Sequence, residues 1–508
     1  MTSTISNLPL LPVLIPMGTG ILLFFFRGRP ELHRALSLAS ALATLAAALR
    51  LLYAVRAQGI LVYLAGGWAA PYGIAFTVDL FSCLMVIMGS TLSITGLLAS
   101  FQTIDAEKER HDYYILWQFL MMGINGTFVT GDLFNLYVFF EIMLISSYGL
   151  LVIGGSRPQL RETFKYLLIN IMSSTLFLIA LGVLYTMLGT VNMADIAQKA
   201  SEAENAHLIS VVSMLFLVVF GIKGAVFPLY IWLPKVHTVA AAPVSSIFSG
   251  LLIKVGVCAM VRTFTLIFVG DPAFTHTVIM IVGVITMFFG VFGAVSQMNY
   301  KSILAYHSVS QVGYMVAGLG LFTVSSVAGT IYFIIHHAFV KACLFLTAGA
   351  AEKITGSKEL KKMGGLLALY PALGFLFFIA AMSLAGVPPL SGFFGKLMLL
   401  LAAAAEENYW MIFCAMAVGV LTLFSMVKIF MYAYWGTPSR VYTPAPGFES
   451  RGSGYMRLLL PIAVLAGLSL LMGLAAQPVL ALCTEAAEQM MDPQLYIDAV
   501  MSVSGVRN

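Results

Sequence analysis

Charged side chains are scarce in this chain of 508 residues. Aspartate, glutamate, lysine and arginine make up 10% of it, against about 25% in an average soluble domain. Hydrophobic residues make up 60%, and the mean hydropathy is +0.95. A soluble protein of this length must cover most of its surface with polar side chains, and this chain has too few of them. The composition therefore excludes a soluble enzyme, a nucleic-acid-binding protein and a disordered chain.

Cysteine is scarce as well, with five residues spread far apart and no Cys-X-X-Cys pair. This spacing argues against a disulfide framework and against a zinc or iron–sulfur site. The sequence shows no nucleotide motif, no flavin or quinone signature and no cluster of metal ligands, so we expect no cofactor. The first segment has no charge before Arg27 and no clear cleavage site, which favours a first spanning helix over a removed signal peptide.

Long apolar segments are what the chain has in quantity. A helix that spans a bilayer needs about 20 apolar residues, whereas strands of a membrane barrel alternate over about ten. We predict an all-α polytopic membrane protein with about fourteen spanning helices. The predicted spans are residues 5–26, 34–55, 76–101, 113–130, 132–154, 163–189, 208–233, 243–269, 276–297, 301–321, 324–350, 365–403, 409–435 and 455–475.

Basic residues are distributed unevenly between the predicted loops. Seventeen of the 27 lysines and arginines fall in loops after odd-numbered spans, and four in loops after even-numbered spans. Because basic residues gather in cytoplasmic loops, we expect a protein of the cell (inner) membrane with both termini on the outer side. The polar stretch 191–206 predicts a short surface helix. The tail after residue 475 is mildly amphipathic and is expected to lie along the membrane or a partner.

Six charged residues stand out because they lie within apolar segments of the chain. A charge near the bilayer centre costs at least about 2.5–3.5 kcal/mol, so these groups favour an ion or proton path that faces the interior of the bundle. Two of them are closer to possible helix ends, where a lysine can extend its amine to the interface. The six are Glu141, Lys223, Lys254, Lys396 and the two near helix ends, Lys341 and Lys428.

Prolines interrupt two spans beside these lysines. Pro228 follows Lys223 by five residues, and Pro388 with Pro389 stands shortly before Lys396. A proline within a helix frees a backbone carbonyl, and broken helices at membrane depth are tolerated where they line a cavity. The two breaks therefore indicate a polar interior next to each lysine.

The spacing of the lysines repeats along the chain. Lys254 follows Lys223 by 31 residues, and Lys428 follows Lys396 by 32. Inverted repeats with broken helices are typical of transporters. We therefore predict helices 1–3 in residues 1–112, two inverted five-helix repeats in 113–270 and 271–436 with helices 7 and 12 broken, and helix 14 with a tail in 437–508.

Histidines add candidates for proton transfer, because imidazole titrates near neutral pH. His336 and His337 are adjacent in span 11, and we expect at most one of them to face the path, without distinguishing which. His307 lies early in span 10. His237, in the predicted loop after span 7, is a candidate for proton intake at the cytoplasmic edge.

Three stretches resemble the antiporter-like subunits of respiratory complex I and its relatives. They are Gly131-Asp-Leu-Phe-Asn-Leu-Tyr-Val-Phe-Phe-Glu141, Phe227-Pro-Leu-Tyr-Ile-Trp-Leu-Pro-Lys-Val-His237 and Ser249-Gly-Leu-Leu-Ile-Lys254-Val-Gly. Within that superfamily the chain is most similar to the D subunits of Mrp sodium/proton antiporters. It departs from many complex I members at Lys235, where they carry aspartate, and it has no fifteenth span or long lateral helix.

The resemblance implies roles for the buried charges and a set of partners. Glu141 matches the family's essential glutamate, Lys223 its paired lysine and Lys254 its central lysine. His336 or His337 matches the relay histidine, and Lys396 the terminal lysine. The resemblance also implies a hetero-oligomer with other membrane subunits, in contact with lipid, protons and Na⁺.

Two functions remain open at the level of sequence. The first is the proton-conducting subunit of a multisubunit Na⁺/H⁺ antiporter, with protons passing from the cytoplasm by Lys223, Lys254 and the histidine pair to an exit at Lys396. The alternative is a proton-pumping membrane subunit of a complex I-like NADH:quinone oxidoreductase or a membrane-bound hydrogenase. A single-chain solute transporter and a membrane scaffold explain the buried lysines poorly. Whether Na⁺ passes through this subunit is not settled by the sequence.

Overall fold

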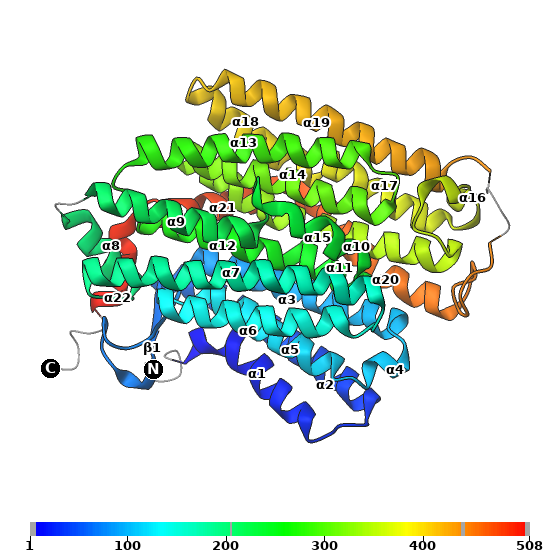
Figure 1. Ribbon diagram of the computed structural model, residues 1–508, viewed down its shortest axis with the longest axis horizontal. Coiled ribbons are helices and arrows are strands. Elements are labelled where there is room, and N and C mark those ends of the chain that lie inside the picture. Colours follow the sequence, from blue (N-terminus) through cyan, green and yellow to red (C-terminus); the bar gives the residue numbers. More distant parts are fainter. Residues whose placement is uncertain (1–6, 204–205, 438–441, 503–508) are drawn as a thin grey trace.

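The computed structural model describes residues 7–203, 206–437 and 442–502. Long helices run side by side along the longest axis of the molecule (Figure 1). Ten helices in the described ranges are long and apolar enough to cross a membrane, judged by length and composition. The predicted all-α class is confirmed, and the count of fourteen spans stays a prediction.

Sixteen longer helices carry the described fold, and each predicted span contains at least one of them. Their bounds are α1 (Leu11–Phe24), α2 (Pro30–Gln58), α3 (Leu80–Thr103), α5 (Tyr113–Val129), α6 (Leu133–Val152), α7 (Arg157–Leu188), α9 (Ala206–Gly224), α12 (Ile253–Leu266), α13 (Pro272–Ser296), α14 (Tyr300–Leu321), α15 (Val324–Thr355), α17 (Pro371–Ala385), α18 (Ser391–Ala405), α19 (Tyr409–Ile429), α20 (Ser453–Leu474) and α21 (Ala476–Met490).

Short elements connect and interrupt the longer ones. The short helices are α4 (Ala106–Glu109), α8 (Met193–Glu202), α10 (Leu233–Val239), α11 (Ala242–Ile247), α16 (Leu366–Leu369) and α22 (Pro493–Ser502). Strands β1 (Leu61–Leu64) and β2 (Ala75–Val78) pair antiparallel between α2 and α3. Single 3₁₀ turns cover Leu8–Leu10, Ala65–Gly67, Leu229–Trp232 and Leu360–Lys362, and π-helical turns cover Phe248–Leu252 and Phe430–Tyr434.

Helix starts follow local capping chemistry. The Asp79 carboxylate accepts a hydrogen bond from the Ser82 amide at 2.8 Å, so α3 begins at Leu80 and the residues before it extend as β2. Asp132 caps α6 and Asn299 caps α14 in the same way. Side-chain oxygens of Asp and Asn satisfy amides that have no partner inside the helix. The predicted start of span 3 at residue 76 was therefore four residues early.

The two halves of the bundle contain matched pairs of backbone hydrogen bonds. The residues before α6 pair with those before α8, through Leu133 to Val191 and Met193 to Gly131, each at 2.9 Å. The residues before α14 pair in the same way with those before the Leu360–Lys362 turn, and each pair of bridged residues is 60 positions apart. Because α8 and α16 lie at opposite ends of the molecule (Figure 1), the matched pairs are inverted, as inverted repeats require.

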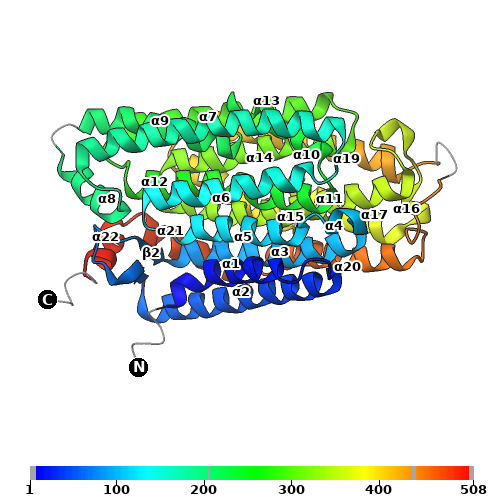
Figure 2. The same ribbon diagram turned by 60° about the horizontal axis from the view of Figure 1, so that its bottom comes forward.

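The centre of the bundle is formed by α15 and α12. The apolar windows of both helices are fully buried, whereas those of α2, α7 and α19 are largely exposed at the periphery. Helix α15 contacts α3, α11, α14, α17, α18, α20 and α21. Figure 2 shows α1 and α2 along one face and α7, α9 and α13 along the opposite one. Charged side chains on α12 and α15 therefore lie inside protein, away from lipid.

The prediction for the C-terminal tail was wrong. Helix α21 packs against α3 and α15, and α22 packs against α8. Cys483, Ala486, Ala487 and Met490 form a buried stripe on α21. Small apolar residues at helical spacing allow this close packing, and the acidic residues between them gave the segment its amphipathic appearance in the sequence. The polar stretch 191–206 does form a short helix, α8.

Candidate functional site

Lys223 lies at the end of α9, where the first predicted break interrupts the helix. The lysine is 3% exposed, and its Nζ lies 5.1 Å from the centre of the Phe140 ring. The 3₁₀ turn after the break places Trp232 so that its Nε1 donates to the Ile222 carbonyl at 2.9 Å. Ala225 has a φ of +57°, a left-handed conformation that a non-glycine residue adopts at a cost. The break therefore fixes a strained turn directly beside the lysine.

Glu141, on α6, is held apart from Lys223. Its Oε1 accepts a hydrogen bond from the Ser174 hydroxyl of α7. Lys223 Nζ has no hydrogen-bond partner within the described residues, although Glu141 is near enough to attract it electrostatically. Glu141 and Lys223 are thus neighbours, as predicted, but their side chains do not form a direct ion pair in this structure.

Lys254 lies on α12, just after the π-helical turn Phe248–Leu252. It is fully buried, and its Nζ donates to the Ser249 carbonyl inside that turn. The Ser249 hydroxyl is 2.7 Å from the Ser308 hydroxyl of α14. A π turn leaves carbonyls without their usual helical donor, so the turn supplies an acceptor for a buried ammonium group. The sequence carried no signal for this turn.

Gly256 brings α12 and α9 into direct contact. A Cβ added at this glycine would lie 2.8 Å from the Lys223 carbonyl carbon, closer than real Cβ atoms come. Only a residue without a side chain therefore allows the backbone of α12 to lie directly against the backbone of α9 at Lys223.

We expect Gly256→Ala to push α12 away from α9. The overpacking should cost about 1–3 kcal/mol of stability, and it should slow proton transfer because Lys254 moves away from Lys223. Thermal unfolding of the purified complex and vesicle transport both check this expectation. Gly182→Ala on α7 is the matched control, because an added Cβ there meets nothing within 4 Å. Equal behaviour of the two variants would contradict the argument.

Lys341 and His237 both lie deeper than the sequence suggested. Lys341 stands in the middle of α15, fully buried, with its Nζ donating to the Leu304 carbonyl of α14. It does not extend to an interface. His237 belongs to the short helix α10 and is also fully buried, 5.8 Å from the Phe345 ring. Its predicted place in a loop was wrong, because the chain after the break forms α10 inside the bundle, and its role in proton intake stays a prediction.

His336 connects to a cluster of hydroxyl groups at the second break. Its Nδ1 is 2.8 Å from the Ser391 hydroxyl, at the start of α18. Ser391, Ser383 of α17 and Ser469 of α20 are mutually hydrogen-bonded at 2.8–3.2 Å. His337 points to no such partner and stacks near Phe333. The hydroxyl cluster was not predicted from the sequence, because serine is common and only the fold brings three distant helices together.

Lys396 occupies the second break itself. Its Nζ donates to the carbonyls of Leu384 and Ala385 at 3.1 and 3.0 Å, the last turn of α17. The end of a helix leaves such carbonyls without partners. The lysine is 8% exposed, and its Nζ lies 5.0 Å from the centre of the Tyr314 ring. Lys396 therefore supplies the donors that these carbonyls lack because the helix is interrupted at Pro388 and Pro389.

Lys428 has the same chemistry at a different place. Its Nζ donates to the carbonyls of Val295 and Gln297, at the end of α13, at 2.7 and 2.8 Å. The residue is half-buried at the last turn of α19. Of the two lysines predicted near helix ends, Lys341 lies in the middle of its helix and Lys428 lies in a last turn, which fits the interfacial interpretation.

Several buried polar groups near these lysines have no hydrogen-bond partner within the described residues. Native proteins pair most buried polar atoms with protein groups or with ordered water. Unpaired groups of this kind lie on α9, α10, α14 and α15, and ordered water is the partner that such groups take in native proteins. The atoms are Lys223 Nζ, both ring nitrogens of His237, His307 and His337, His336 Nε2, and both amide atoms of Gln311.

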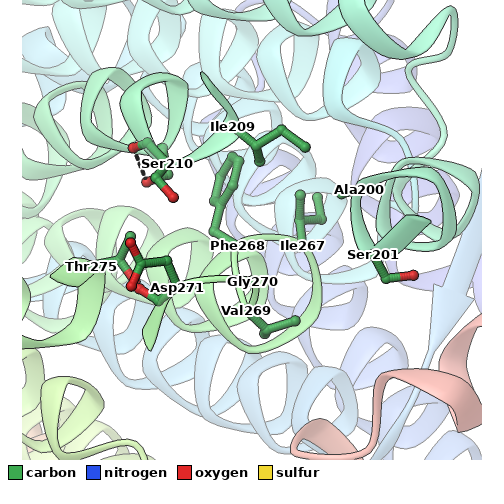
Figure 3. A pocket seen from close by; sticks show the side chains of 11 residues that line it. Ala200, Ser201, Ile209, Ser210, Ile267, Phe268, Val269, Gly270, Asp271 and Thr275 are labelled. Carbon is green, nitrogen blue, oxygen red and sulfur yellow. Dashed lines mark hydrogen bonds between the residues drawn. The ribbon is translucent and has the colours of Figure 1, made fainter. Parts of the chain in front are cut away.

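A separate pocket lies at the end of the molecule that carries α8. It has a volume of about 200 Å³ and lies between α8, α9 and the turn before α13. Figure 3 shows the Phe268 ring among Ile209 and Ile267, with Asp271 and Thr275 side by side at another wall. None of the buried lysines or histidines of the predicted path lines it.

Comparisons with known proteins agree with the resemblance seen in the sequence. The family described as "NADH:quinone oxidoreductase/Mrp antiporter, TM" matches residues 130–422. The chain is 49% identical to the D subunit of the Na(+)/H(+) antiporter of Alkalihalophilus pseudofirmus, over 98% of this chain and 99% of that protein. It is 42% identical to the protein of the same name from Bacillus subtilis, over 98% and 99% of the two chains.

A solved structure shares the architecture over its whole length. A chain in the structure of the Mrp complex from Dietzia sp. superposes with a TM-score of 0.91 at 32% identity, covering 98% of this chain and 100% of that one. Together with the family match, this likeness shows that the chain belongs to the NADH:quinone oxidoreductase/Mrp antiporter transmembrane family.

Proposed function

We propose that the chain is the proton-conducting subunit of a multisubunit Na⁺/H⁺ antiporter. The full-length likeness to proteins named as the D subunits of Na(+)/H(+) antiporters carries this proposal. A row of buried lysines and histidines is the chemistry that proton transfer requires, and Lys223 and the histidines carry nitrogens without a hydrogen-bond partner within the described residues. The protein is then a transporter subunit and not an enzyme, embedded in a membrane with other subunits around it.

In this proposal protons move along buried groups from Lys223 by Lys254 and the α15 histidines to Lys396. The contact of Ser249, the acceptor of Lys254, with Ser308 of α14 and the contact of His336 with Ser391 of α18 support the route, because each links two helices. Lys396 is the last member before the second break. Both histidines of the adjacent pair are included, since both are buried next to lysines.

Glu141 acts as the switch of the first half. It exchanges the Ser174 hydroxyl for the Lys223 ammonium, and the open arrangement seen here corresponds to the step in which Lys223 releases its proton toward Lys254. Buried ion pairs are costly to desolvate and need good geometry to compensate. A glutamate with a second partner can therefore leave Lys223 without becoming an isolated buried charge.

Transport in everted vesicles that contain the whole complex tests the function. A pH gradient is imposed and then challenged with Na⁺, in wild type and in Lys223→Ala. We expect Na⁺ to collapse the gradient in wild type without any electron donor, and to have no effect in the variant. A Na⁺-independent acidification on adding NADH or reduced ferredoxin would instead assign the chain to a redox-driven pump.

A further inference from the structure

A polar cavity opens at the end of the bundle opposite α8. It has a volume of about 470 Å³, enough for on the order of ten water molecules. Its walls come from the end of α3, the α10–α11 turn, the start of α14 and the end of α15. Neither Lys223 nor Lys396 lines it, so it lies apart from both helix breaks.

A chain of ion pairs runs from the mouth of this cavity into its floor. Glu352 bridges Lys358, at 3.3 Å, and Lys301, at 2.8 Å. The Glu352 side chain is 30% exposed, whereas that of Lys301 is 4% exposed. The predicted span 301–321 begins at Lys301, and the structure buries this residue in the first turn of α14. The carboxylate therefore contacts the solvated cavity on one side and a buried lysine on the other.

The mouth is ionised and hydrated. Asp105 and Lys108 form an ion pair at 2.5 Å, and the hydrogen bond from Lys108 lowers the pKa of the Asp105 carboxyl below its ordinary value. Lys353 lies 4.0 Å from the same carboxylate. These exposed charges of both signs attract water to the mouth of the cavity. Because salt screens them at physiological ionic strength, they do not form an electrostatic barrier to a proton.

Behind the floor lie two buried groups, His237 and Lys341. Lys301 Nζ is 3.4 Å from the Ala240 carbonyl, and Ala240 is three residues after His237. Leu304, one turn after Lys301 on α14, accepts the hydrogen bond from Lys341. Three residues, slightly less than one helical turn, thus separate Ala240 from His237 and Lys301 from Leu304 along the chain.

We propose that this cavity is the vestibule through which protons enter from the cytoplasm, and that the Lys301–Glu352 ion pair is the gate between it and the buried pair His237 and Lys341. The proposal rests on the proposed function. The cytoplasmic side follows from the lysine-rich loops at this end of the molecule. Protons then join the buried row at its centre, and Glu352 is the group that exchanges them with the vestibule water.

Cysteine accessibility tests the vestibule separately from transport. Ala241 lines the cavity and is partly exposed. Four of the five native cysteines are buried, so a Cys414→Ser background removes the remaining half-buried thiol. In that background, a membrane-impermeant methanethiosulfonate should label Ala241→Cys in everted vesicles and not in right-side-out vesicles. Ala338→Cys, fully buried on α15, is the matched control and should stay unlabelled.

The gate is tested by transport in the assembled complex. Positioned acid–base groups accelerate proton transfer about a hundredfold or more, so we expect a loss of that size in Glu352→Gln and in Lys301→Met. The charge exchange Lys301→Glu with Glu352→Lys should recover part of the rate, which a purely structural defect would not allow. The Ala241→Cys variant should transport at the wild-type rate before labelling, and labelling should block its transport.

Three results would overturn the inference. They are labelling of Ala241→Cys from the outer face, no labelling from either face, and unchanged transport in both single gate variants. If wild-type vesicles show no Na⁺-driven transport, the proposed function fails, while labelling from the cytoplasmic face still establishes the vestibule.

Discussion

Glu141→Ala and Lys223→Ala are each expected to abolish transport while the complex still assembles. Lys223 is buried with no hydrogen-bond partner in the described part of the chain, and Glu141 is the carboxylate that acts on it. Positioned acid–base groups accelerate proton transfer about a hundredfold or more, so removing either one should slow transport by at least that factor. Na⁺-induced collapse of the pH gradient in vesicles measures the rate.

Two further variants make this expectation specific. Glu141→Asp keeps the charge on a shorter side chain and should retain part of the activity. Ser174→Ala removes only the alternative partner of Glu141, so it should assemble and transport, with a changed rate. Subunit content of the purified complex serves as the assembly control. Full transport in either alanine variant of the pair would contradict the assignment.

Lys396→Ala should have a comparably large effect on transport and an additional effect on stability. The variant leaves the Leu384 and Ala385 carbonyls without a donor inside the bundle. Unpaired buried polar groups cost about 1–3 kcal/mol each. We therefore expect a lower melting temperature of the complex together with loss of transport, measured on the same preparation.

Lys428 separates the two contributions. Lys428→Ala also removes a lysine that donates to two carbonyls, but at a half-buried helix end where water can replace it. It should transport normally. Lys396→Arg should keep much of the stability that Lys396→Ala loses, because arginine also donates hydrogen bonds. It should not restore transport, because arginine stays protonated. Equal transport in the two alanine variants would remove Lys396 from the path.

The fold was largely predictable from sequence because the length of each apolar segment and the charges within it can be read from neighbouring residues alone. Each predicted span contains a helix, and the chain is interrupted at the prolines next to Lys223 and Lys396. The boundary errors arose where a side chain sets the start, as Asp79 does for α3. The predicted division of the chain into domains, and the roles of the path residues, stay predictions.

What could not be predicted depends on contacts between distant segments. Lys301 is buried because Glu352, 51 residues later, neutralises it. The hydroxyl cluster exists only because α17, α18 and α20 meet. The π turn before Lys254 is a local change of helix geometry without a distinctive sequence, yet it supplies the acceptor for that lysine.

The matched hydrogen-bond pairs before α6 and α14 set the two halves in register. Nine residues after Asp132 stands Glu141, and nine residues after Asn299 stands Ser308. A duplicated unit inserted in both orientations has no preferred direction of its own, since each half is the other read backwards. The carboxylate in one half and the hydroxyl in the other break that symmetry. In the proposed function, the direction of proton flow therefore depends on positions, such as Glu141 and Ser308, at which the two halves carry different side chains.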